Sequence, residues 1–217
     1  MTYSVKEIFY TLQGEGAHAG RPAVFLRFAG CNLWSGRDRD RLRGPGGCSR
    51  WCDTEFVGTD GAGGGRFGSP SELVSAVARC WPSAWAAKQV VPFVVCTGGE
   101  PLLQLDEALL TAFNTAGWAV AIETNGTQLP PPGRAWLTVS PKAHAPLRLT
   151  SGNELKLVFP QIGAEPERFE GLAFDHFFLQ PLDGPQKNEH VQQALGYCLT
   201  HPQWRLSLQT HKILSIP

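Results

Sequence analysis

The chain is organised around one stretch that holds three cysteines. It reads Cys31-Asn-Leu-Trp-Ser-Gly-Arg-Asp-Arg-Asp-Arg-Leu-Arg-Gly-Pro-Gly-Gly-Cys48-Ser-Arg-Trp-Cys52-Asp53. Sixteen residues separate Cys31 from Cys48, and three separate Cys48 from Cys52. Four ligands complete a structural zinc site, whereas three thiolates on an iron–sulfur cluster leave one iron open to another ligand. Alternatively, the three cysteines are unrelated residues near a loop and bind no metal. Their spacing alone does not exclude this interpretation.

Composition limits the possible classes of protein. A chain of 217 residues fits a single α/β domain, which we place at 1–217. Its 19 Lys and Arg residues balance 19 Asp and Glu residues, so charge gives no reason to expect nucleic-acid or membrane binding. The chain has no apolar run long enough to cross a bilayer and no signal-peptide core at its start. We therefore expect a cytoplasmic protein whose thiols are reduced and free to bind metal.

The remaining cysteines and the arginine-rich part of the loop have simpler interpretations. Cys80, Cys96 and Cys198 occur in apolar helix or strand contexts, which predicts core positions. The arginines at 37, 39, 41 and 43 alternate with Asp38 and Asp40, a pattern typical of a solvated loop rather than a phosphate-binding patch.

The order of apolar segments predicts alternating strands and helices. We expect strands at 3–10, 22–29, 89–96, 118–122, 136–139, 154–159, 176–179 and 205–208, a helix that starts at Ser69, and further helices at 106–116 and 189–200. Ser69, Pro70 and Glu72 have the pattern of a capping box at a helix start. Parallel βα units are the natural interpretation, although several connections are too short for a full helix.

Polar residues follow the ends of these strands one after another. Any one such loop is weak evidence, but in a (βα) barrel or half-barrel the carboxyl ends of the strands share one rim, where active sites lie. The residues concerned are Cys31, Thr97 to Glu100, Glu123, Ser140 and Lys142, Gln180 and Asp183, and Gln209 and His211.

Three further features suggest a ligand site, each with a structural alternative. Arg27 on an apolar strand needs a partner, which is either a structural carboxylate or an anionic ligand. Gln13 and Glu15 could present side chains to a ligand, or their glycine neighbours could simply form a turn. The run Gly98-Gly99-Glu100-Pro101 lets a ligand approach the backbone closely, or it is an ordinary strand-to-helix turn.

The cysteine loop and the Gly98-Gly99-Glu100-Pro101 turn together resemble the radical S-adenosylmethionine (SAM) superfamily. Nearly the whole chain further resembles the family of 7-carboxy-7-deazaguanine synthases. The early Gln-Gly-Glu-Gly and the late Gln-Thr-His-Lys do not belong to the superfamily at large, so they make the resemblance specific. The matching stretches are 7–16, 28–34, 52–54, 97–101, 123–126, 140–142, 180–181 and 209–212.

This resemblance implies a fold and a set of cofactors. The fold would be a partial (βα) barrel of the radical SAM type, with some crossover helices shortened or missing and a long cluster-binding loop at 31–52. Cys31, Cys48 and Cys52 would be the catalytic ligands of a [4Fe–4S] cluster, with SAM chelating the open iron. The residues implied to bind SAM are Trp51, Gly98, Gly99, Glu100, Ser140, Pro141, Lys142, Gln180, Pro181, Leu182 and Asp183.

The resemblance also implies a reaction in queuosine biosynthesis. A 5′-deoxyadenosyl radical would remove a hydrogen from C6 of 6-carboxy-5,6,7,8-tetrahydropterin, and the ring would contract with loss of ammonia to 7-carboxy-7-deazaguanine. The enzyme would thus be a carbon–nitrogen lyase that regenerates SAM, and the hydroxyl of Thr54 would bind Mg²⁺. The residues implied to bind substrate are Leu12, Gln13, Gly14, Glu15, Arg27, Thr97, His211 and Pro217, the last through its free carboxylate.

Partners follow from the resemblance too. The family suggests a homodimer and an electron donor such as flavodoxin or ferredoxin. The balanced charge leads us to expect no nucleic-acid or membrane partner. Two other functions stay open. One is a radical SAM activase that acts on another protein. Arg27, Gln13 and His211 argue against it, because they favour a small anionic substrate. The other is a non-catalytic scaffold stapled by a metal, which metal analysis would distinguish.

The last cysteine spacing departs from the family, which keeps two residues between the final pair. Aligning Cys52 places the expected ligand at Ser49, one residue after Cys48. Either the run Gly44-Pro45-Gly46-Gly47 lets the loop shift so that Cys48 reaches iron, or the cluster is labile or altered. We favour the first, because an alcohol is a poor iron ligand beside a thiolate.

Overall fold

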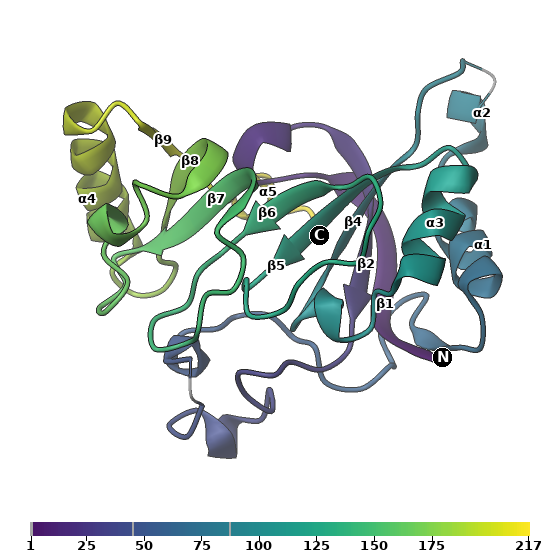
Figure 1. Ribbon diagram of the computed structural model, residues 1–217, viewed down its shortest axis with the longest axis horizontal. Coiled ribbons are helices and arrows are strands. Elements are labelled where there is room, and N and C mark those ends of the chain that lie inside the picture. Colours follow the sequence, from purple (N-terminus) through teal and green to yellow (C-terminus); the bar gives the residue numbers. More distant parts are fainter. Residues whose placement is uncertain (1, 45, 87) are drawn as a thin grey trace.

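A computed structural model describes residues 2–44, 46–86 and 88–217. Within these residues one nine-stranded sheet runs in the order β3-β1-β2-β4-β5-β6-β7-β8-β9 (Figure 1). The strands are β1 (Tyr3–Leu12), β2 (Pro22–Phe28), β3 (Gly65–Phe67), β4 (Phe93–Gly98), β5 (Ala119–Thr124), β6 (Trp136–Val139), β7 (Ser151–Phe159), β8 (Ala173–Pro181) and β9 (Trp204–Leu206). The α-helices are α1 (Pro70–Cys80), α2 (Ser83–Ala86), α3 (Glu107–Thr115), α4 (Lys187–Thr200) and α5 (Thr210–Leu214).

The sheet is parallel from β2 onward, which confirms the expected α/β fold. The first two strands differ from a βα unit, because β1 pairs antiparallel with β2 and also with β3. Gln13 N–H donates to Arg21 O (2.8 Å) and Gly20 N–H to Gln13 O (2.7 Å), which closes a hairpin between β1 and β2. Such a short connection cannot contain a crossover helix, so the two strands must run in opposite directions.

Helices cover the outer face of the sheet unevenly. Figure 1 shows α1 and α3 at one side and α4 at the other. Among the described residues, the β5–β6 and β6–β7 connections contain no helix, and the β7–β8 connection contains only a 3₁₀ turn at Pro166–Arg168. The structure therefore confirms a partial barrel with shortened or missing crossover helices.

Side chains alternate between the two faces of each parallel strand. Leu26, Cys96 and Ile122 point outward and pack with α1 and α3, whereas Leu155 and Leu179 pack with α4. Cys96 is fully buried in the core, as predicted, whereas Cys80 and Cys198 are only partly buried and pack against the two core clusters. The other set of side chains points to the inner face, and it becomes polar toward the carboxyl ends of the strands.

Two local details refine the sequence interpretation. Ser69 Oγ accepts from Glu72 N–H (3.2 Å), so Ser69 caps α1 as predicted. The Glu72 carboxylate reaches back to the Gly68 N–H (2.8 Å), one residue before the cap. The glycine-rich connector at 60–68 contains strand β3, which was not predicted, because Gly65 to Phe67 extend the sheet edge beside β1.

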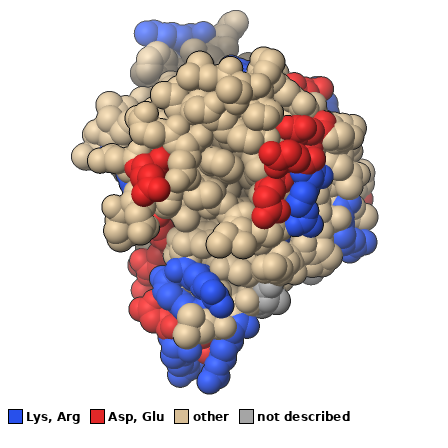
Figure 2. All heavy atoms as spheres, turned by 90° about the vertical axis from the view of Figure 1, so that its left-hand side faces the viewer, with Lys and Arg blue, Asp and Glu red and all other residues tan. Residues whose placement is uncertain are grey.

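The arginine-rich loop lies at the edge of the molecule. Figure 2 shows Lys and Arg side chains mixed with Asp and Glu at the lower end, where the loop around the 3₁₀ turn Asp38–Asp40 lies in Figure 1. Arg37, Arg39 and Arg43 are exposed, in agreement with a solvated loop, whereas Arg41 is partly buried. None of the helices in the described part of the chain is long and apolar enough to span a membrane.

Candidate functional site

A cavity of about 400 Å³ opens at the carboxyl ends of the parallel strands. Its wall joins segments from both ends of the chain, including β1, the cysteine loop, the strand ends and α5. Most of the residues singled out from the sequence lie in this wall: Leu12, Gln13, Gly14, Glu15, Arg27, Cys31, Cys48, Trp51, Cys52, Thr54, Thr97, Gly98, Gly99, Ser140, Lys142, Gln180, His211 and Pro217. The shared rim expected from the strand ends is therefore present.

Five residues expected to bind the cofactor are not part of this wall: Glu100, Pro141, Pro181, Leu182 and Asp183. Glu100 is fully buried and accepts from Thr124 Oγ1 (2.7 Å), Asn125 N–H (2.8 Å) and Leu102 N–H (3.0 Å). Burial raises its pKa despite these hydrogen bonds. In this structure Glu100 ties the end of β4 to the loop after β5, and its binding of SAM stays a prediction.

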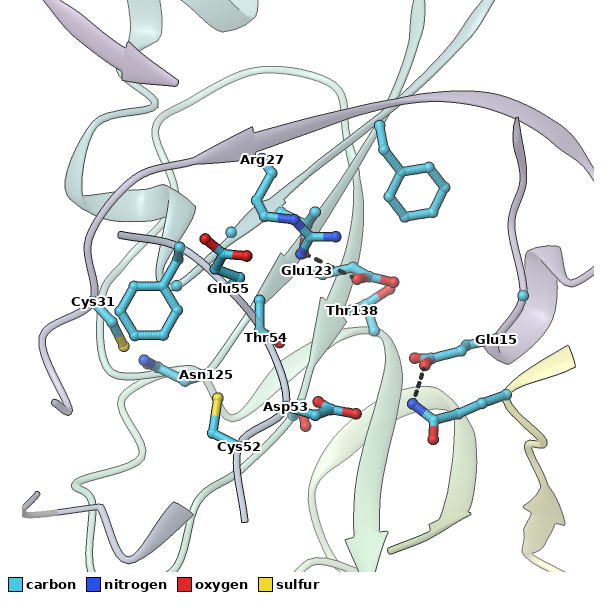
Figure 3. Close-up of a pocket in the computed structure, with 18 of the residues that line it drawn as sticks. Glu15, Arg27, Cys31, Cys52, Asp53, Thr54, Glu55, Glu123, Asn125 and Thr138 are labelled. Carbon is cyan, nitrogen blue, oxygen red and sulfur yellow. Dashed lines mark hydrogen bonds between the residues drawn. The ribbon is translucent and has the colours of Figure 1, made fainter. Parts of the chain in front are cut away.

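Cys31 and Cys52 lie at one end of the cavity, away from Glu15 (Figure 3), and Cys48 lines the same cavity. Burial raises the pKa of Cys31, and it raises the pKa of Cys48 to about 11. No three His, Cys, Asp or Glu side chains in the described residues converge on a single ion. A four-iron cluster does not need such convergence, because each thiolate binds a different iron.

The structure distinguishes Cys48 from Ser49. Cys48 lines the cavity, whereas Ser49 is buried behind it and donates its hydroxyl to the carbonyl oxygen of Arg41 (2.5 Å). The 3₁₀ turn Cys48–Arg50 follows Gly47, whose φ of +65° favours glycine. The side chain in position to reach the cavity is therefore the thiol. Pro45, part of the run expected to let the loop shift, lies outside the described residues.

Gly98 and Gly99 have a packing role that the sequence did not reveal. A Cβ on Gly98, whose φ is +148°, would lie 2.4 Å from the carbonyl oxygen of Phe28. A Cβ on Gly99 would lie 2.2 Å from the carbonyl oxygen of Gly30 and 2.7 Å from Cβ of Cys31. The two glycines let the end of β4 approach the start of the cysteine loop, so they position Cys31 as well as lining the cavity.

The opposite end of the cavity is built around Lys156, which the sequence analysis missed. This Lys is 5% exposed and pairs with Glu15 (2.5 Å) and Glu123 (3.2 Å). Burial alone would lower its pKa, but the charges of Glu123 and Glu15 outweigh burial and raise it. Burial would raise the pKa of Glu15, but Lys156 and a hydrogen bond from Gln209 lower it to about 2. This end of the cavity therefore holds fixed charges.

Glu123 is the meeting point of several donors. It accepts from Gln13 Nε2 (3.1 Å) and Thr97 Oγ1 (3.2 Å) in addition to Lys156. Arg27 Nε donates to Glu7 Oε1 (2.7 Å), so a structural carboxylate is one partner of this Arg. Arg27 nevertheless lines the cavity, so its position is compatible both with a structural carboxylate and with an anionic ligand as its partner.

The C-terminal segment forms part of the wall. Thr210 N–H and Oγ1 both donate to the carbonyl oxygen of Gly14 (3.0 Å each), which places His211 beside Gly14. Thr11 Oγ1 donates to a backbone oxygen of Pro217 (2.9 Å). Lys212 joins Asp53 (2.5 Å) to Asp183 (2.6 Å), so α5 connects the cysteine loop with the end of β8.

The wall suits a nucleoside-like cofactor between the two ends. Gln180 is 7% exposed, and its Oε1 has no hydrogen-bond partner within the described residues, so a ligand donor would satisfy a buried acceptor. Lys142 Nζ donates to Ser140 Oγ (2.5 Å) and lies 5.8 Å from the centroid of the Trp51 ring. Burial lowers the pKa of Lys142. The three thiols, the open acceptor and this cation fit an iron–sulfur cluster with a bound nucleoside.

Comparison with known proteins gives a consistent picture. No family model matches the chain. The 7-carboxy-7-deazaguanine synthase of Bordetella pertussis is 62% identical over 217 residues, with 100% of both chains covered. The protein of the same name from Caulobacter vibrioides is 57% identical over 217 residues, again covering 100% of both. The crystal structure of QueE from Escherichia coli superposes with a TM-score of 0.68 at 27% identity, covering 96% of this chain and 94% of that one.

Proposed function

The chain belongs to the 7-carboxy-7-deazaguanine synthase family of radical SAM enzymes, and from this we propose that it converts 6-carboxy-5,6,7,8-tetrahydropterin to 7-carboxy-7-deazaguanine with loss of ammonia. The observation that carries the proposal is the cavity itself. One continuous wall contains three cysteines at one end and a fixed set of charged and amide side chains at the other. The cavity therefore offers adjacent binding sites to a redox cofactor and to a polar heterocycle.

The cysteine end would hold the cofactors. Cys31, Cys48 and Cys52 would bind a [4Fe–4S] cluster, which together with SAM supplies the one-electron chemistry that removes a hydrogen atom from the substrate. Gly98 and Gly99 have no side chains, so the methionine part of SAM would approach the backbone closely at these positions. The unpartnered Oε1 of Gln180 would accept from SAM, and Ser140, Lys142 and Trp51 would bind it as well.

The other end would bind and orient the pterin. Donors and acceptors on Gln13, Glu15 and Thr97 suit the amide and amino groups of a pterin edge. Arg27 would pair with the substrate carboxylate through its remaining N–H groups, with Glu7 holding the guanidinium in place. His211, whose segment closes over this end, would help to exclude water from the reacting ring.

A magnesium ion fits the wall beside the cysteines. The hydroxyl of Thr54 lines the cavity, and hydroxyl and carboxylate oxygens are the ligands that Mg²⁺ prefers. The carboxylate of Asp53 is bound by Lys212, so Thr54 is the better placed protein ligand, with substrate oxygens completing the shell.

The proposal is tested by anaerobic turnover. Protein reconstituted with iron and sulfide is incubated with carboxytetrahydropterin, SAM, Mg²⁺ and a reductant, and product is identified by mass spectrometry. We expect 7-carboxy-7-deazaguanine from the native protein and a large loss of kcat/KM in Arg27→Met, with Arg66→Met, on the short edge strand β3, as the matched control. A protein with a full cluster that forms no deazaguanine would refute the proposal.

Partners and compartment belong to the same proposal. The six cysteines are free thiols in the structure, and a cluster enzyme needs a reducing compartment, which supports a cytoplasmic location. Flavodoxin or ferredoxin would donate the electron, and the chain would form a homodimer, which light scattering of the purified protein checks. Iron and sulfide analysis would separate the enzyme from a zinc-stapled scaffold.

A further inference from the structure

The loop that carries Cys48 and Cys52 contains a set of contacts that the proposed function does not use. Arg41 Nη1 donates to the carbonyl oxygens of Ser49 (2.9 Å) and Cys52 (3.1 Å). In return, Ser49 Oγ donates to the carbonyl oxygen of Arg41 (2.5 Å). Three hydrogen bonds therefore tie Arg41 to the short turn between two of the three cysteines.

The Arg41 side chain is itself held in place. Its Nε donates to Asp38 Oδ1 (2.8 Å), and its Cζ lies 4.9 Å from the centroid of the Trp34 ring. Trp34 is buried and packs edge-on against Phe56, with 5.7 Å between centroids. A planar guanidinium that is fixed on one edge and stacked on an aromatic ring presents its remaining N–H groups in a defined direction.

Ser49 occupies a closed space on the side away from the cavity. It is 1% exposed, and a Cβ on Gly44 would lie 2.6 Å from its hydroxyl oxygen. Only a glycine at position 44 lets the loop close over this hydroxyl. The preceding residue, Cys48, lines the cavity, and its carbonyl oxygen accepts from Cys52 N–H (2.8 Å).

We propose that Arg41 and Ser49 form a clamp that presets the Cys48–Cys52 turn for cluster binding and turns the extra residue, Ser49, out of the site. This inference rests on the proposed function, because it requires the three cysteines to hold a cluster. Arg41 acts as a positioning residue, since its contacts are with carbonyl oxygens of the turn. The clamp explains how three residues, rather than two, fit between the last two cysteine ligands.

Cluster retention tests the clamp directly. Arg41→Gln, Arg41→Lys and Ser49→Ala are compared with Arg39→Gln, whose side chain is on the same loop and 72% exposed. After anaerobic reconstitution, we expect all four to bind iron and sulfide, and Arg41→Gln and Arg41→Lys to release iron to a chelator roughly tenfold faster than native protein, because charge-assisted hydrogen bonds are lost. Ser49→Ala should change the rate in the same direction, and Arg39→Gln should not change it.

The reduction potential of the cluster distinguishes the effect of the Arg41 charge from its effect on the position of the turn. Reduction adds negative charge to the cluster, so Arg41→Gln should lower its midpoint potential, whereas Arg41→Lys keeps the cation and should leave the potential near the native value. Circular dichroism of the metal-free variants checks folding. If Arg41→Gln does not fold, Ser49→Ala carries the test, and native iron release in that variant would overturn the clamp.

The clamp and the proposed function fail in different ways. Equal iron release from Arg41→Gln and Arg39→Gln would refute the clamp, whatever product the native enzyme forms. A native protein with a stable cluster that makes no deazaguanine would refute the function, while faster iron release from the Arg41 variants would still support the clamp.

Discussion

At the scale of single residues, Lys156 organises the polar end of the cavity. It lies on β7 two residues after Glu154, so both side chains point to the inner face of the barrel. The sequence does contain a pattern that could have identified Lys156, namely the alternation Glu154-Leu-Lys156-Leu-Val158 inside an apolar strand. Two charged side chains on one face of a buried strand require partners. Those partners, Glu15 and Glu123, are distant in sequence, and sequence alone could not name them.

We predict that Lys156→Met destabilises the protein. Its removal leaves the carboxylates of Glu15 and Glu123 without their buried cation, and loss of one partner of a buried pair costs about 3 kcal/mol or more. Urea unfolding at neutral pH measures the change. The control is Lys187→Met, because its pair with Asp183 is partly exposed, and such pairs contribute about 1 kcal/mol or less. Equal effects of the two substitutions would contradict the assignment.

The same pair predicts a pH dependence. The pKa of Glu15 is lowered from 4.5 to about 2 in the folded protein, so its contribution to stability is present above about pH 4.5 and is lost as the pH falls toward 2. The difference in unfolding free energy between native protein and Lys156→Met should be constant near neutrality and shrink in acid. A difference that persists unchanged below pH 3 would show that the ion pair is not its source.

The assignment of Cys48 gives a separate prediction. Cys48→Ala should prevent assembly of a full cluster, because it removes the thiol that lines the cavity, whereas Ser49→Ala should still assemble one. Iron and sulfide content and the cluster absorbance band measure this outcome. Cys80→Ala, on α1, is the control for cysteine loss outside the site. A complete cluster in Cys48→Ala would show that another residue binds the iron.

At the scale of elements, the approach of β4 to the cysteine loop is a structural requirement of the site. We predict that Gly99→Ala lowers stability by about 1–3 kcal/mol and weakens cluster binding, since its Cβ would collide with Gly30 and Cys31. Gly171→Ala is a matched control, because a Cβ there meets no atom within 4 Å. Thermal unfolding and iron content measure the two effects. Unchanged values in Gly99→Ala would argue against tight packing at this position.

The elements also show what sequence reasoning could reach. Apolar strands such as β4 and the capped helix α1 were predicted because period and capping are local signals. The antiparallel pairing of β1, the edge strand β3 and the short helix α5 were not. Each of them depends on tertiary contacts, such as Lys212 between Asp53 and Asp183, which leave no periodic pattern in the sequence.

At the scale of the whole molecule, the site is shared between the two ends of the chain. The segment after β1 and α5 meet through Gly14 and Thr210, so both ends of the chain contribute to the wall of the cavity. The position of the cavity followed from strand ends sharing one rim, as the sequence predicted. Which rim residues face the cavity did not follow, because burial of Glu100 and pairing of Asp183 depend on neighbours from other strands.

The measurement that most directly tests the central claim uses substrate labelled with deuterium at C6. Reconstituted native protein is incubated anaerobically with this carboxytetrahydropterin, SAM, Mg²⁺ and reductant, and both product and SAM are analysed by mass spectrometry. The account predicts 7-carboxy-7-deazaguanine together with deuterium in recovered SAM, since SAM is regenerated in each turnover. Unaltered substrate and unlabelled SAM in a protein with a full cluster would contradict it.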